Sequence, residues 1–112
     1  MGVKAIPKRL LIHTIEYEEF AGSGAWDDEF AEPITIRGVR VEPISRLSRS
    51  RDSEGEQVSH IVFVDRINSS AFPDFKIRSR IKFRGVSREV VDVKPFHAFD
   101  TSGPHHYEIE LN

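Results

Sequence analysis

Cysteine is absent from the 112 residues of the chain. The protein therefore cannot form a disulfide framework, supply a thiolate nucleophile or bind a metal through sulfur. It also lacks any continuous apolar run near the length of about 18 residues that a membrane-spanning helix needs. We therefore expect a single domain over residues 1–112 that folds on an apolar core, with no membrane partner.

The motifs of common catalytic sites are missing as well. There is no P-loop, no G-x-G-x-x-G, no G-x-S-x-G and no H-E-x-x-H. His105 and His106 are adjacent, so on a strand they would point to opposite faces, and nothing in the spacing of the five histidines requires a zinc site. We predict no enzymatic activity, no catalytic residue, no bound metal and no cofactor.

Net charge is small, at −2, but the charges are segregated along the chain. Residues 10–36 hold seven acids and no Lys or Arg, whereas residues 75–88 hold six basic residues and no acid. Residues 37–51 hold five arginines and one acid. These runs indicate either solvated strand faces or complementary surfaces that join subunits head to tail. The basic segments could also face phosphates.

Short apolar segments with a period of two dominate the chain and predict β-strands. They cover residues 10–18, 34–42, 58–65, 77–84, 86–94 and 105–111. We therefore predict an all-β fold, a small antiparallel β-barrel of about six strands with at most a short helical turn. The best candidate for that turn is residues 68–75, which Pro73 limits in length.

Two positions predict local irregularities. The inward residues of the second strand change parity around Gly38, which indicates a β-bulge there. Arg84 and Gly85 separate two strand patterns and predict a hairpin turn. Pro95 is expected to end its strand, and Glu110 is expected to face solvent in the last one.

Two connections are longer than the two to about five residues usual between strands of small β-domains. Residues 19–32 are predicted to form an acidic loop, in which Trp26 either caps the core from outside or anchors a partner. Residues 43–57 are predicted to form a mobile loop that carries Arg46, Arg49 and Arg51.

Four pieces of this pattern together resemble one known family. They are an opening strand at residues 6–13, a second strand at 33–43, a hairpin at 81–93 and a closing strand at 105–111. The chain is similar in these pieces, and over nearly its whole length, to the small minor capsid proteins of tailed bacteriophages and prophages. Those proteins look like head-closure proteins, also called head–tail connectors or stoppers.

The resemblance implies a structural virion protein at the head–tail junction, assembled in the bacterial host cytoplasm. Its subunits would form a homo-oligomeric ring below the portal, close the DNA-filled head and dock the tail. The partners would then be portal or adaptor proteins, tail proteins and packaged DNA. In that arrangement the long loop would place Arg46, Arg49 and Arg51 toward the channel.

The charged segments supply the predicted subunit or partner contacts. These residues are Trp26, Asp27, Asp28, Glu29, Arg78, Arg80, Lys82 and Arg84. An alternative interpretation is a small oligonucleotide-binding β-barrel that uses its basic segments. That alternative does not explain the acidic first third of the chain.

Overall fold

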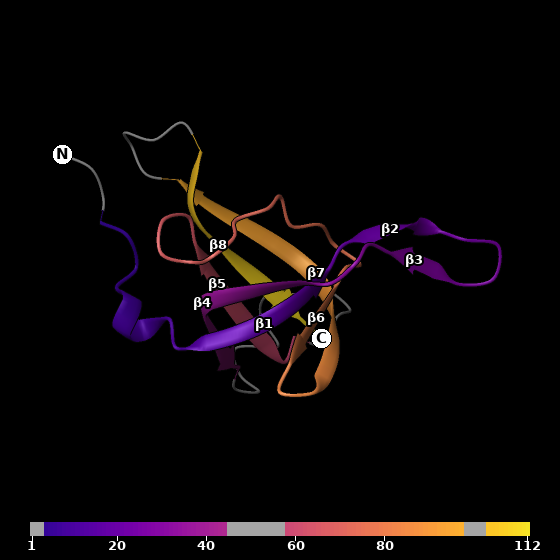
Figure 1. The fold of residues 1–112 in the computed structure, drawn as a ribbon, viewed down its shortest axis with the longest axis horizontal. Helices are drawn as coiled ribbons and strands as arrows, with labels where there is room; N and C mark the ends of the chain where they lie inside the picture. Colours follow the sequence, from indigo (N-terminus) through magenta and orange to yellow (C-terminus); the bar gives the residue numbers. More distant parts are fainter. Residues whose placement is uncertain (1–3, 45–57, 98–102) are drawn as a thin grey trace.

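The computed structural model describes residues 4–44, 58–97 and 103–112. Its elements follow the order η1, Lys8–Leu10; β1, His13–Glu18; β2, Phe20–Ser23; β3, Asp28–Phe30; β4, Ile34–Pro43; β5, His60–Asp65; β6, Arg80–Phe83; β7, Val86–His97; and β8, Pro104–Leu111. Six of the strands close into an antiparallel barrel in the order β1-β4-β5-β8-β7-β6, as Figure 1 shows. The predicted fold class is confirmed.

The barrel interior is filled by aliphatic side chains of the barrel strands, although Ile34 and Ile77, which the period-two patterns also placed inward, are exposed. Ile15, Ile36, Val62, Ile81 and Ile109 are fully or almost fully buried there. β-Branched side chains pack well on pleated strands, which explains why this composition folds as a barrel. The connection between β5 and β6 closes one end of the barrel with aromatic contacts. The ring centroids of Phe72 and Phe75 lie 4.8 and 5.3 Å from that of Tyr107.

Both predicted irregularities are confirmed. Gly38 has φ of +71°, and the β1–β4 register shifts beside it, since His13 pairs with Val39 and Thr14 pairs with Arg37. Arg84 and Gly85 both have positive φ between β6 and β7, as a tight two-residue hairpin turn requires.

The predicted helical turn at residues 68–75 is wrong. Asp65, which is fully buried, accepts the backbone N–H groups of Ile67 and Asn68 through its carboxylate, at 3.0 and 2.8 Å. This is the pattern of a helix N-cap, and the N–H of Ser69 donates to the carbonyl of Asp65 at 3.2 Å. The N–H of Ser70, however, donates to the carbonyl of Arg37 on β4 at 2.9 Å instead, so no helix continues into residues 70–75. Among the described residues the single helical turn is η1, which lies within the segment 6–13 that the family resemblance had placed in an opening strand.

Two strand details also differ from expectation. Pro95 lies inside β7, because β6 pairs only as far as Glu89 and the missing Pro N–H then faces an unpaired strand edge. Glu110 is buried rather than exposed, and its carboxylate lies 2.7 Å from the ammonium of Lys94 on the neighbouring strand.

The structure describes one of the two long connections in full and the other only at its start. Residues 19–32 are not simply a loop, because β2 and β3 form a separate two-stranded sheet that projects from the barrel (Figure 1). In the segment 43–57, Pro43 ends β4 and Ile44 donates a backbone hydrogen bond to Ser59. Arg46, Arg49 and Arg51 lie outside the described residues. No helix in the described ranges is long and apolar enough to cross a membrane.

Candidate functional site

The projecting hairpin, which we call the arm (residues 19–32), forms around two aromatic residues. Phe20 pairs with Phe30 across the two strands, and their ring centroids are 6.0 Å apart. The backbone turns at Gly24, whose N–H donates to the carbonyl of Asp27 at 2.8 Å. Trp26 lies in this turn with 96% of its surface exposed. It therefore does not cap the core, and partner contact, the other role predicted for it, stays a prediction.

The arm is anchored to the barrel through a buried hydroxyl. Ser79 is fully buried, and its Oγ accepts the backbone N–H of Phe20 at 2.9 Å. The same Oγ lies 3.1 Å from the hydroxyl of Tyr17, which in turn accepts the backbone N–H of Lys76 at 3.0 Å. These bonds join the first strand, the arm and the segment before β6 at one point.

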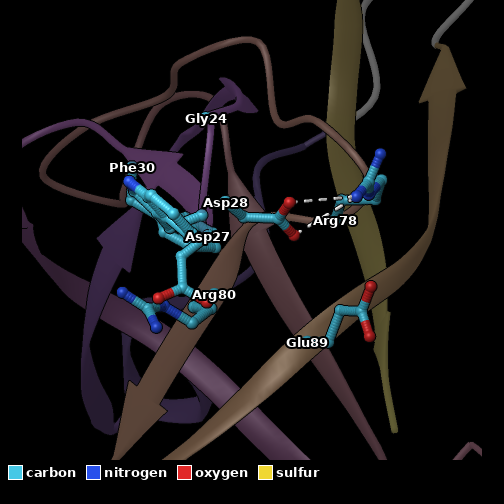
Figure 2. A pocket seen from close by; sticks show the side chains of 8 residues that line it. Gly24, Asp27, Asp28, Phe30, Arg78, Arg80 and Glu89 are labelled. Carbon is cyan, nitrogen blue, oxygen red and sulfur yellow. Dashed lines mark hydrogen bonds and ion pairs between the residues drawn. The ribbon is translucent and has the colours of Figure 1, made fainter.

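Two arginines next to this anchor pack against the arm. The guanidinium of Arg78 lies 4.4 Å from the ring centroid of Phe20, and that of Arg80 lies 3.8 Å from the ring centroid of Phe30. A guanidinium over an aromatic face contributes about 0.5–1 kcal/mol at an exposed site. Arg78 also pairs with Asp28 at 3.2 Å, as the dashed lines in Figure 2 show.

The acidic and basic segments of the sequence therefore meet within one chain. Besides the Arg78–Asp28 pair, Arg80 lies 3.4 Å from Glu18 and Lys76 lies 3.2 Å from Glu19. All of these side chains are partly exposed, so each pair contributes at most about 1 kcal/mol to stability. The Arg78–Asp28 and Lys76–Glu19 pairs connect the arm to the segment before β6, whereas the Arg80–Glu18 pair joins two barrel strands.

An open cleft of about 750 Å³ lies between the arm and the barrel wall formed by β6 and β7. Figure 2 shows Asp27, Asp28 and Phe30 on the arm side, and Arg78, Arg80 and Glu89 on the barrel side. Gly24 and Trp26 complete the lining. A wall with aromatic faces and charges of both signs suits a polypeptide segment better than a uniform polyanion.

The remaining predicted contact residues are not in the cleft. Lys82 is exposed on β6, opposite Ser87, and Arg84 lies in the following turn with its guanidinium 4.8 Å from the Phe83 ring centroid. On the arm, Asp27 and Glu29 are exposed, and they form no ion pair with the residues that the structure describes. Asp28, which pairs with Arg78, lies opposite Ser23 and between these two acids in the sequence, so paired and unpaired acids alternate along the arm.

The anchoring residues were missed by sequence reasoning. Ser79, Phe20 and Phe30 are essential to the geometry, yet none of them was a predicted site residue. A signal was present, because Phe20 and Phe30 flank a stretch containing Gly22 and Gly24 in the manner of a hairpin.

The histidines show no sign of chemistry in the described part of the chain. No three His, Asp or Glu side chains there lie close enough to hold a metal ion. His13 accepts the backbone N–H of Val41 through Nδ1 at 2.9 Å, and burial, aided by the charge of Arg84, lowers its pKa. Burial likewise lowers the pKa of His60, and nearby Arg88 adds to this effect. Both groups favour the neutral state, in keeping with structural histidines at the end of a barrel.

A family model described as minor capsid protein matches residues 7–111, which include the whole barrel and the arm. The chain belongs to this minor capsid protein family. No curated protein matches it. Membership indicates a structural role in the bacteriophage virion, with other virion proteins as partners, and argues against a catalytic role.

Proposed function

We propose that this minor capsid protein is a head–tail connector component. Its subunits form a ring below the portal, close the DNA-filled head and dock the tail. The observation that carries this proposal is the arm, a pre-positioned projection whose exposed Trp26 and unpaired Asp27 and Glu29 extend beyond the barrel. A large exposed aromatic residue on an anchored element is typical of an interface hot spot.

The closed barrel supports the same proposal. Closure pairs the barrel strands with one another and leaves little free edge for adding a strand from a second protein. Association must then use side chains and projections such as the arm. Many weak contacts of this kind become strong together when a ring closes, because the later contacts are effectively intramolecular.

Two further groups of residues have roles in this proposal. Lys82 and Arg84, exposed at the β6–β7 end of the barrel, contact the portal, adaptor or tail protein that lies above or below the ring. Arg46, Arg49 and Arg51 face the DNA channel, as the family resemblance implies. If these three arginines were changed together to Ala and assembled heads still retained DNA normally, the channel role would be wrong.

The alternative function, an oligonucleotide-binding barrel, receives less support. Arg78 and Arg80 pair with acids of the same chain and stack on its Phe rings, so they are not available to phosphates. A nucleic-acid interface needs a net positive surface, and the adjoining arm is acidic.

The decisive experiment is binding to portal-capped heads that lack tails. We expect the purified protein to be a monomer by light scattering and to sediment with these heads as a ring. Capsid shells without portals serve as the matched control and should bind nothing. A protein that ignores both particles but binds single-stranded oligonucleotides in a salt-sensitive way would replace the connector function with the nucleic-acid one.

A further inference from the structure

The end of the molecule opposite the arm carries a complementary surface. Figure 1 shows η1 and the arm at opposite ends of the longest axis. Around η1, Lys8, Arg9, Leu10 and Ile12 are all exposed, with Ile12 exposed to 65%. We call these four residues the η1 patch. It is basic and apolar, whereas the outer arm is acidic and aromatic.

The η1 patch is held in a fixed position, as a docking surface requires. Leu11, in the middle of the segment, is buried, and the carbonyl of Leu10 accepts a hydrogen bond from Arg40 Nη1 at 3.1 Å. Farther along, the N–H of Ile6 donates to the buried carboxylate of Asp65 at 3.0 Å. Ordering this segment therefore costs little at the moment of binding.

The charges on both sides are available for a partner. Lys8 and Arg9 form no ion pair with the described residues, and neither do Asp27 and Glu29 on the arm. The two positive charges of the η1 patch of one molecule can thus meet the two negative charges on the arm of a second molecule. Each end also presents exposed apolar side chains, which supply the buried area that charge alone does not.

We propose that the arm and cleft of one subunit receive the η1 patch of the next copy of this chain. Leu10 and Ile12 pack against Trp26, while Lys8 and Arg9 pair with Asp27 and Glu29. The two surfaces are different, so the contact is heterologous and repeats around a closed ring or along an open filament. This inference rests on the proposed function in one respect only, the choice of a closed ring over an open filament.

The absence of cysteine allows a direct test. Ala25 next to Trp26 and Thr14 next to Ile12 are exposed, and both can become cysteine without removing a proposed contact. A chain carrying Ala25→Cys and Thr14→Cys is treated with a short bis-maleimide under two conditions. In one the protein is concentrated in solution, and in the other it is bound to portal-capped heads. We expect a ladder of covalent oligomers. A control chain carrying Ala25→Cys and Ser87→Cys, with its second thiol away from the patch, should give several-fold less.

Charge reversal separates a specific contact from a folding defect. A chain with Asp27→Lys and Glu29→Lys, or one with Lys8→Glu and Arg9→Glu, should lose the ladder in the cysteine background. Mixing these two chains should restore the ladder, because the reversed arm of one chain meets the reversed patch of the other and their unchanged surfaces also meet. Heterodimers alone would report only the unchanged pair of surfaces. Trp26→Ala should weaken association roughly thirtyfold, as expected for a central aromatic anchor.

The outcomes for this contact and for the connector function are distinct. If wild-type protein binds heads but the paired cysteines give no more product than the control pair, the contact is wrong and the connector function stands. If the ladder forms in concentrated solution while heads bind nothing, the contact stands and the connector function fails. The assigned pairing of Lys8 and Arg9 with Asp27 and Glu29 would be wrong if the charge-reversed chains still formed the ladder. It would also be wrong if mixing the two chains did not restore the ladder.

Discussion

The barrel and the arm are both antiparallel β-structure, but different forces hold them. The barrel encloses a continuous apolar core, in which Ile36, Val62 and Ile109 are fully buried. The arm has no core. An isolated two-stranded hairpin is marginal in water, and this one depends on a buried hydroxyl, two stacked arginines and exposed ion pairs with the segment before β6. The comparison shows how a closed scaffold can support a projection that the arm's own residues would not stabilise.

Truncation of the core should affect both regions at once and have the largest effect. Ile109→Ala truncates a fully buried side chain of β8, the strand that lies between β5 and β7. We expect it to lower the free energy of unfolding by about 2–5 kcal/mol. Trp26→Ala, at the exposed end of the arm, should change it by no more than about 0.5 kcal/mol. Urea unfolding followed by far-UV circular dichroism measures both. Equal effects would mean that the arm contributes to the core.

Substitution at the bulge should come next and affect the barrel alone. In Gly38→Ala, an added Cβ would lie 2.8 Å from the carbonyl oxygen of Asn68, in a backbone with φ of +71°. We expect a cost of about 2–4 kcal/mol from strain and contact together. Gly85→Ala shares the positive φ but meets no atom within 4 Å, so it should cost about 1 kcal/mol. Thermal unfolding of the two variants should separate strain from contact, and equal costs would rule out the contact with Asn68.

Removal of the hydroxyl that joins the two regions should have an intermediate effect. Ser79→Ala leaves the N–H of Phe20 without its acceptor and takes a partner from Tyr17, which we expect to cost about 1–3 kcal/mol. Amide hydrogen exchange should show faster opening of the arm than of β8. Ser87→Ala, on the exposed face of β7, is the matched control and should leave both rates unchanged. Uniform acceleration across the barrel would contradict a local anchoring role.

The barrel could be predicted from the sequence because its signals are local. Tyr107, Ile109 and Leu111 alternate inward as expected, and Gly38 marks the bulge because parity changes around it. Phe20 and Phe30 gave a local signal for the hairpin of the arm, but its position could not be predicted, because that depends on Arg78 and Arg80, some fifty residues away in the sequence. The ion pairs within one chain were missed for the same reason, since segregation of charge along a sequence does not reveal which segments meet.

The stability of the barrel should decrease in acid. Burial lowers the pKa of His13 in the folded protein, so the unfolded chain binds this proton more readily. Stability should therefore be complete above the ordinary histidine pKa of about 6.5 and should fall as pH decreases from there toward the folded pKa. His13→Asn keeps an acceptor for Val41 and should flatten this slope, whereas His97→Asn, at an exposed position, should not. Denaturant unfolding at several pH values measures how the free energy of unfolding depends on pH. An unchanged slope in His13→Asn would assign this pH dependence to other groups.

The smallest change in stability should come from Arg78, and it should appear almost entirely in the arm. Arg78→Asn removes the ion pair with Asp28 and the stacking on Phe20, while Asn tolerates the left-handed backbone at this position, where φ is +72°. Because the side chain is half exposed, we expect the free energy of unfolding to fall by less than about 1 kcal/mol. The amides of β2 and β3 should nevertheless become more mobile in ¹⁵N relaxation, and added salt should reproduce part of this change in the wild-type protein by screening the pair. Lys82→Asn, on β6 and without a described ion pair, should leave the arm as it is. An arm that stays rigid in Arg78→Asn would mean that Ser79 and the Arg80–Phe30 contact are sufficient to position it.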